Sequence, residues 1–163
     1  MKREIYQNLH DFVLKHEGLK RAVTLGTKFL PGIVYLSYPL MLLWLIFMDR
    51  GALPRAVTVP AAGFLICTVL RAKINAPRPY EKLGIPAVTK KDTVGKSFPS
   101  RHAACGSVIA VTALWAVPPL GVFLLAVSLL IAVSRVFAGV HFIRDVSAGW
   151  LLGALIGLIG ILL

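Results

Sequence analysis

Hydrophobic residues in this chain fall into five long runs, and the polar residues gather in two basic stretches. The apolar runs cover residues 32–48, 56–70, 103–117, 120–134 and 146–163. A helix needs ~20 residues to cross a bilayer, and the flanks of the shorter runs can extend each by a turn or more. Pro118-Pro119 separates the third run from the fourth and is typical of a tight turn between two helices. We therefore expect an all-α membrane protein, with about five transmembrane helices in a single domain covering residues 1–163.

The first polar stretch, residues 1–28, has the pattern of an amphipathic helix. Lys15, Lys20, Arg21 and Lys28 can ring one side of such a helix. The opposite side would carry Ile5, Leu9, Phe12, Val13, Leu19, Val23 and Leu25. This pattern favours a helix that lies in the headgroup layer of the membrane. A cytosolic extension is the alternative interpretation.

The second polar stretch, residues 71–101, is rich in basic residues, proline and glycine. Loops of this length are usually functional or disordered. We interpret it as an active-site loop at the membrane surface. For Lys82, Lys90, Lys91 and Lys96 within it, anchoring at the membrane interface is the better interpretation.

Composition narrows the possible partners. Hydrophobic residues make up 57% of the chain and charged residues 15%, whereas soluble domains carry ~25% charged residues. The net charge of +11 is compatible with nucleic acid, anionic lipid headgroups or an anionic substrate. Because the apolar runs must sit in lipid, we expect no nucleic-acid partner. Membrane lipids and a phosphorylated substrate remain.

The candidate chemistry begins with His141 and Asp145, which stand four residues apart. On a helix these positions share a face, so Asp145 can accept a hydrogen bond from one ring nitrogen of His141. The other ring nitrogen is then free to act as a nucleophile or base. By itself, such a pair is more often a structural contact.

Other residues on the same side of the bundle change that interpretation. Arg135 follows Ser134 at the end of the fourth run, and Arg78 lies between two prolines that stiffen its backbone. Ser100 can act as the N-cap of the third helix, whose first free N–H groups attract anions. Arginines bind phosphoryl oxygens bidentately, while one histidine can attack and another can protonate the leaving oxygen. The set is therefore suited to phosphoryl transfer.

These residues resemble the three-part motif of the type 2 phosphatidic acid phosphatase family, which shares its core with vanadium haloperoxidases. Its last part, Ser-Arg-x5-His-x3-Asp, is present in full as Ser134, Arg135, His141 and Asp145. Its middle part, Pro-Ser-Gly-His, corresponds to Pro99-Ser100-Arg101-His102, and its first part, Lys-x6-Arg-Pro, to Arg71 through Arg78-Pro79. The resemblance extends from about residue 30 to the C-terminus.

The resemblance implies a role for each matched residue. His141 would attack phosphorus and form a phosphohistidine, Asp145 would orient His141, and His102 would protonate the leaving group and then activate water. Arg71, Arg78 and Arg135, with Ser100, would hold the phosphoryl oxygens. Neither a metal nor another cofactor is needed, because the arginines supply the positive charge.

Two residues depart from the family motif. Arg71 replaces a lysine, and Lys73, two residues later, is the alternative candidate for binding phosphate in its place. Arg101 replaces a glycine, and its side chain is a candidate for contacting a second phosphate or the headgroup. Both departures bear on substrate choice more than on the chemistry.

The sequence thus predicts a metal-independent membrane lipid phosphatase. Its candidate substrates are phosphatidylglycerophosphate, undecaprenyl diphosphate and phosphatidic acid. A non-catalytic lipid-binding or transport protein is the alternative, and a haloperoxidase is disfavoured because it would be soluble. The motif indicates neither the headgroup nor the oligomeric state.

We expect a multi-pass protein of the cell membrane. Sixteen of the 18 Lys and Arg residues would lie on the side of the site, leaving Arg50 and Arg55 on the other. The positive-inside rule then favours a cytoplasmic site.

Overall fold

The chain folds as a bundle of helices, and the computed structural model describes residues 3–89, 91 and 93–163. Those residues form no β-strand. The helices are α1 (Arg3–Lys15), α2 (Glu17–Met48), α3 (Leu53–Ile74), α4 (Pro79–Leu83), α5 (Arg101–Ala116), α6 (Pro118–Phe137) and α7 (Ile143–Leu162), with a short 3-10 helix at Arg50–Ala52. This confirms the expected all-α fold.

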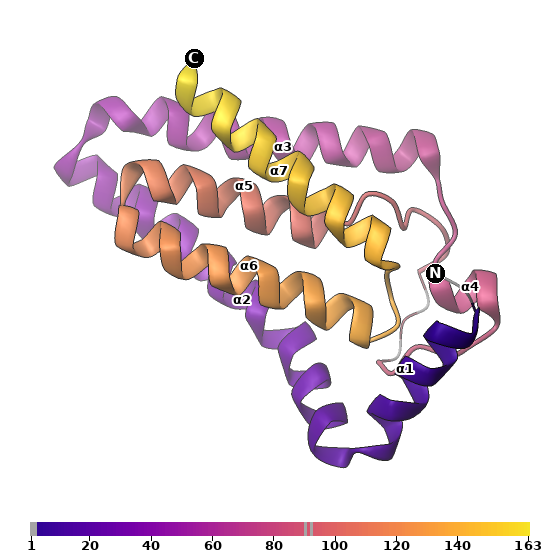
Figure 1. Cartoon of the computed structure of the whole chain (residues 1–163). Coiled ribbons are helices and arrows are strands. Elements are labelled where there is room, and N and C mark those ends of the chain that lie inside the picture. Colours follow the sequence, from indigo (N-terminus) through magenta and orange to yellow (C-terminus); the bar gives the residue numbers. More distant parts are fainter. Residues whose placement is uncertain (1–2, 90, 92) are drawn as a thin grey trace.

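The long helices run back and forth between two ends of the bundle (Figure 1). Within the described residues, four segments are long and apolar enough to cross a membrane, and they contain α2, α3, α6 and α7. The fifth long helix of the bundle, α5, has only 16 residues. It packs against α3, α6 and α7, so its neighbours shield most of its length. The protein is therefore a multi-pass membrane protein.

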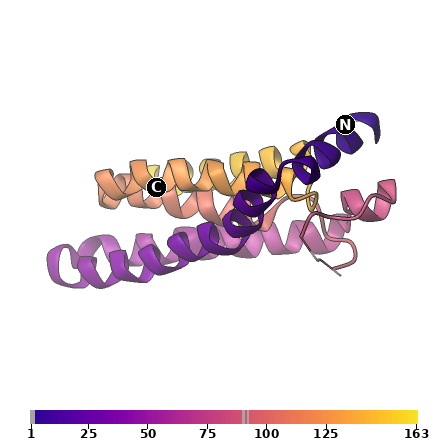
Figure 2. The same cartoon turned by 90° about the horizontal axis from the view of Figure 1, so that it is seen from below.

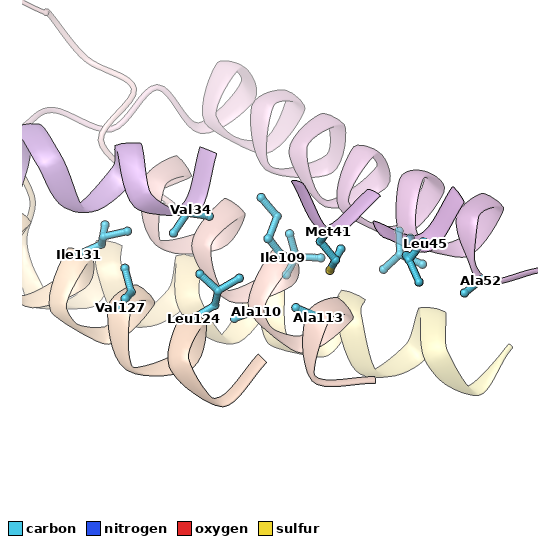
Figure 3. Packing of buried hydrophobic residues seen from close by; sticks show 13 residues of the cluster. Val34, Met41, Leu45, Ala52, Ile109, Ala110, Ala113, Leu124, Val127 and Ile131 are labelled. Atoms are coloured by element: carbon cyan, nitrogen blue, oxygen red, sulfur yellow. The ribbon is translucent and has the colours of Figure 1, made fainter. Parts of the chain in front are cut away.

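The bundle has two layers, with α5, α6 and α7 in one and α2 and α3 in the other (Figure 2). Between the layers lies a core of aliphatic side chains (Figure 3). Its centre is formed by Val34, Met41, Ile109, Leu124 and Ile131. The outward faces carry apolar side chains that are more than half exposed, among them Leu36, Leu65, Val122 and Leu155. Such a surface on every outer helix is suited to lipid, since a soluble protein would bury it.

The N-terminal segment differs from the predicted interfacial helix of residues 1–28. The helix breaks at His16, whose backbone is extended, and residues 17–28 continue without interruption into the first long span as α2. Figure 1 shows α1 and the start of α2 as a V that projects from the bundle. In α1, Val13 is fully buried against Ala138 and Val140 of the α6–α7 connection. Residues 1–28 therefore do not form one separate helix, and part of the apolar face of α1 packs on protein.

The active-site loop is also shorter than the predicted range of 71–101. Helix α3 continues to Ile74 and ends at Asn75, which adopts the left-handed conformation common at helix C-termini (φ 43°, ψ 41°). Arg71 and Lys73 therefore lie in the last turn of a helix. The connection that follows contains α4 and ends where α5 begins at Arg101.

Glycines allow α7 to approach α5 closely at the end of the bundle that contains this loop. A Cβ atom added at Gly149 would lie 2.4 Å from the carbonyl oxygen of Ser100, and one at Gly153 would lie 2.1 Å from that of Ala104. Backbone atoms cannot move aside as a flexible side chain can. The two glycines therefore set the spacing between the start of α5 and the start of α7.

We expect Gly153→Ala to destabilise the protein by about 1–3 kcal/mol, because its methyl group overpacks the contact with α5. Thermal unfolding of the purified protein in detergent measures this. Leu155→Ala is the matched control, since Leu155 is 56% exposed on the lipid-facing side of the same helix. Equal melting temperatures for Gly153→Ala and the wild type would contradict the close α5–α7 contact.

Candidate active site

A polar cavity of about 340 Å³ opens at the end of the bundle where α3, α5 and α6 meet the long α3–α5 connection and the short α6–α7 connection. Its charged and titratable wall residues are Arg71, Arg78, Lys91, Lys96, Arg101, His102, Arg135 and His141. Six of these were predicted as site residues from the sequence. They come from positions as far apart as 71 and 141, so only the fold brings them together.

His141 reaches Asp145 mainly through a serine. The Ser97 hydroxyl donates a hydrogen bond to Asp145 Oδ2 at 2.6 Å and lies 3.2 Å from His141 Nδ1. Because its proton is directed to the carboxylate, the Ser97 oxygen is free to accept from the Nδ1–H of the imidazole. The direct distance from His141 Nδ1 to Asp145 Oδ2 is 3.8 Å. This arrangement leaves Nε2 of His141 unprotonated, as a nucleophile requires.

We predicted that His141 and Asp145 lie on the same face of one helix, and this prediction was wrong. His141 lies in the connection before α7, and only Asp145 is within the helix. Asp145 is fully buried at the start of α7, where it also accepts a hydrogen bond from the backbone N–H of Phe142 at 3.1 Å. The carboxylate of Asp145 therefore holds the turn that carries His141. Through Ser97, it also holds the imidazole ring.

Ser97 is the residue of this group that the sequence did not indicate. It is fully buried, although it belongs to the polar loop, and its partners are 44 and 48 residues away in the chain. In the sequence, the one feature that could have indicated Ser97 is its place two residues before the motif part Pro99-Ser100-Arg101-His102.

We expect Ser97→Ala to lower kcat by about 10- to 100-fold, the equivalent of losing a hydrogen bond to a charged group of roughly 1.5–3 kcal/mol. KM should stay near its wild-type value, because Ser97 lies behind His141 and does not line the cavity. Ser97→Thr keeps the hydroxyl and should restore part of kcat. A rise in KM with unchanged kcat would contradict a positioning role.

Three arginines of the cavity are held by neutral acceptors. Arg71 donates from Nη1 to the carbonyl oxygen of Pro99 at 2.7 Å, and Arg78 donates from Nε and Nη1 to those of Gly95 and Val140. Arg135 donates from Nη2 to the carbonyl oxygen of Thr27 at 3.2 Å. Since carbonyls do not neutralise a guanidinium, all three keep their positive charge for an anion.

Arg135 also has a vacant donor. Its side chain is 7% exposed, and its Nε has no hydrogen-bond partner among the residues that the structure describes. A buried donor without a partner is costly in a native structure and is typical of a position that a ligand fills. Arg135 Nε is therefore suited to donate to a bound oxyanion.

Glu81 shapes the loop around Arg78. Its carboxylate accepts the backbone N–H of Arg78 at 2.7 Å and that of Gly95 at 3.0 Å. It therefore ties the start of α4 to the last part of the loop. Glu81 does not line the cavity, and no Asp or Glu is among the described residues of the cavity wall.

Two predicted phosphate-binding residues are not on the cavity wall. Lys73 is exposed on α3, because two residues turn a helix by about 200° and place it opposite Arg71. Ser100 immediately precedes α5, but its hydroxyl makes no capping hydrogen bond and is buried without a partner among the described residues. Arg71, and not Lys73, therefore faces the cavity.

Two lysines predicted to be interfacial anchors do line the cavity, namely Lys91 and Lys96. Partial burial, together with the nearby charges of Arg135 and Arg78, lowers the pKa of Lys91. Both lysines therefore have a candidate role at the cavity wall in addition to the predicted anchoring. Lys82 lies away from the cavity beside Phe142 and Arg144, and Lys90 lies outside the described residues.

Burial lowers the pKa of His141 to about 4, although the nearby carboxylate of Asp145 acts in the opposite direction. The positive charge of Arg78 lowers this pKa further. A lowered histidine pKa means that the ring remains neutral until the pH falls to about 4. The imidazole is therefore neutral, and able to attack, throughout the neutral and mildly acidic range.

We expect the ring of His141 to be uncharged at pH 5.5, where an ordinary histidine of pKa ≈ 6.5 would be about nine-tenths protonated. An NMR titration of nitrogen-labelled histidine in detergent measures this, with His141→Gln assigning the signal. A His141 resonance that titrates near the ordinary value would contradict the effect of burial.

Comparison with known proteins places this arrangement in a family. The model of the PAP2 superfamily matches residues 52–163, which include every charged residue of the cavity wall. An undecaprenyl-diphosphatase of Sulfolobus acidocaldarius is 30% identical over 135 residues, covering 80% of this chain and 64% of that relative. The chain thus spans somewhat less than two thirds of the length of this relative.

Two solved structures share the fold. LpxE of Aquifex aeolicus superposes with a TM-score of 0.78 at 24% identity. The superposition covers 98% of this chain and 94% of the LpxE chain. A transmembrane PAP2 type phosphatidylglycerolphosphate phosphatase from Bacillus subtilis gives a TM-score of 0.70 at 22% identity. That superposition covers 97% of this chain and 81% of the Bacillus protein. At these identities, the likeness establishes the architecture of the bundle.

Proposed function

The chain belongs to the PAP2 superfamily, and from this membership and the geometry of its cavity we propose that it is a metal-independent membrane lipid phosphatase. One observation carries the proposal. The imidazole of His141, linked through Ser97 to the buried carboxylate of Asp145, faces a cavity whose arginines have no carboxylate partners within the described residues. The names of the similar proteins support a lipid substrate.

The first chemical step forms a phosphohistidine. Nε2 of His141 attacks phosphorus, and the bond from phosphorus to the lipid oxygen breaks. Arg71, Arg78 and Arg135 hold the phosphoryl oxygens, whose charge is spread over the transition state. His102 lines the same cavity and gains a proton when the anionic phosphoryl group binds beside it. The departing lipid oxygen takes this proton from His102.

The second step returns the enzyme to its starting state. His102, now neutral, removes a proton from a water molecule that attacks the phosphohistidine. The bond between phosphorus and Nε2 breaks, and inorganic phosphate leaves. Throughout, the Ser97–Asp145 pair stabilises the positive charge that the imidazole gains when it is phosphorylated.

The direct test is phosphate release from phosphatidylglycerophosphate, undecaprenyl diphosphate and phosphatidic acid by the purified protein in detergent with EDTA. We expect release from at least one lipid at a rate that EDTA does not change. Lipid binding without phosphate release from any of them would favour the non-catalytic alternative. Release that EDTA abolishes would contradict the metal-independent mechanism.

We further propose that the site faces the cytoplasm. Arg50 and Arg55 lie at the turn between α2 and α3, at the opposite end of the bundle from the cavity and from α1 (Figure 1). By their positions in the sequence, all other Lys and Arg residues belong to segments at the cavity end of the bundle. An excess of positive charge favours the cytoplasmic side of a membrane. A cytoplasmic site favours phosphatidylglycerophosphate as substrate, whereas an outer site favours undecaprenyl diphosphate.

Cysteine labelling in intact cells tests this orientation. Gly51 and Lys82 are both exposed and lie at opposite ends of the bundle, and the native Cys67 and Cys105 are buried. A membrane-impermeant maleimide should label Gly51→Cys in intact cells and Lys82→Cys only after permeabilisation. The reverse pattern would place the site on the outer face.

A further inference from the structure

The cavity carries more positive charge than one phosphoryl group can balance. Arg71, Arg78 and Arg135 already supply three charges, whereas a phosphomonoester carries about −1.5 to −2 at pH 7. Lys91, Lys96 and Arg101 add three more cations to the same wall, and the described wall contains no carboxylate. Like charges gathered in a partly enclosed space repel one another unless an anion offsets them.

Arg101 is the most informative of the additional cations because of its position. Its guanidinium lies over the ring of Phe64, with 5.6 Å between Cζ and the ring centroid. Phe64 precedes Arg71 by seven residues of α3, which places it two turns, or about 10 Å, further into the membrane on the same face. Thr68, midway between them, also lines the cavity. Arg101 therefore lies on the bilayer side of the cavity.

A lipid substrate must pass this side of the cavity. Its terminal phosphoryl group has to reach His141, while its tails stay in the bilayer, so the headgroup between them extends past Arg101. Stacking on Phe64 orients the guanidinium and leaves its N–H groups available for hydrogen bonds. Within the part of the chain that the structure describes, Arg101 forms no ion pair with a carboxylate.

We propose that Arg101 forms a second anion subsite, which binds a further phosphoryl group on the lipid side of the scissile bond. Lys91 and Lys96, which belong to the loop, add positive charge that offsets the negative charge of this second group. This inference rests on the proposed phosphatase function and gives it a substrate class, namely lipids with two phosphoryl groups in preference to phosphatidic acid. The second group is either bonded directly to the first, as in a lipid diphosphate, or separated from it by glycerol, as in phosphatidylglycerophosphate.

Substrate preference in Arg101 variants tests the subsite. The quantity measured is kcat/KM for undecaprenyl diphosphate and for phosphatidylglycerophosphate, each divided by that for phosphatidic acid. Arg101→Gly introduces the residue found in the family motif, and Arg101→Gln removes the charge while keeping a polar side chain. We expect at least one ratio to fall about tenfold in both variants, corresponding to about 1.4 kcal/mol.

Lys82→Gln is the matched control, because Lys82 is an exposed cation of the same connection that lies away from the cavity. Its two ratios should equal those of the wild type. A fall in the diphosphate ratio alone identifies directly bonded phosphoryl groups, and a fall in the phosphatidylglycerophosphate ratio identifies the glycerol-spaced pair. Unchanged ratios in both Arg101 variants, with active enzyme, would overturn the subsite and leave the phosphatase function standing.

A binding measurement separates this inference from the proposed function. Methylenediphosphonate carries two phosphoryl-like groups that cannot be hydrolysed, and methylphosphonate carries one. In EDTA, the wild-type protein should bind the first more tightly, and Arg101→Gln should remove most of the difference. If no lipid is hydrolysed, this result still supports the subsite, whereas equal affinities in the wild type would overturn it.

Discussion

Replacing His141 with alanine is expected to lower phosphate release by at least about 10³-fold, because no other side chain can accept the phosphoryl group at that position. Lipid binding should persist, since the cavity arginines do not depend on the imidazole for their hydrogen bonds. Single-turnover phosphate release and binding of the lipid to the inactive variant measure the two effects.

The control for this experiment is His16→Ala. His16 is exposed at the break between α1 and α2 and does not line the cavity. This variant should release phosphate at the wild-type rate. If His141→Ala retains a substantial share of the wild-type rate while remaining folded, His141 is not the nucleophile.

Replacing Arg135 with lysine is expected to lower kcat by about 10²–10³-fold, the effect typical of removing one donor that stabilises a transition state. Lysine keeps the charge but offers a single ammonium in place of a planar fork, and it cannot supply the vacant donor at Nε. Steady-state kinetics with the best lipid substrate measure kcat and KM separately.

A matched arginine at the other end of the bundle controls for charge and helix packing. Arg50 is exposed, and its Nε donates to the carbonyl oxygen of Ile46 at 2.9 Å. Arg50→Lys should therefore leave kcat unchanged. A loss in Arg135→Lys that appears only in KM would indicate ground-state binding and contradict transition-state stabilisation by Arg135.

The sequence was sufficient for the architecture and for most of the cavity. Apolar runs of nearly the span length predicted the long helices, and the structure extends them, as when the run at 56–70 becomes α3. The order of the motif parts along the chain also predicted that the two connections lie at the same end of the bundle. Arg78, Arg135 and His141 meet there as expected. These predictions succeeded because they depend on hydrophobicity and on residues near the ends of helices.

Contacts between distant segments account for what the sequence did not predict. Ser97 reaches His141 and Asp145 only because the loop folds inward, and no periodicity indicates that fold. Likewise, Val13 of α1 packs against the α6–α7 connection, which is more than 120 residues away in the chain. Lys91 and Lys96 looked like surface residues in the chain, and only the path of the loop places them at the cavity.

We propose that His141 becomes covalently phosphorylated during turnover. This proposal is tested most directly by mixing excess enzyme with a lipid that carries a radiolabelled terminal phosphate and stopping the reaction in alkali, which preserves phosphohistidine. Mass spectrometry then locates the phosphate. We predict label on the peptide that contains His141, appearing before inorganic phosphate and absent from His141→Ala. Label on a different side chain, or phosphate released at the full rate by His141→Ala, would contradict the account.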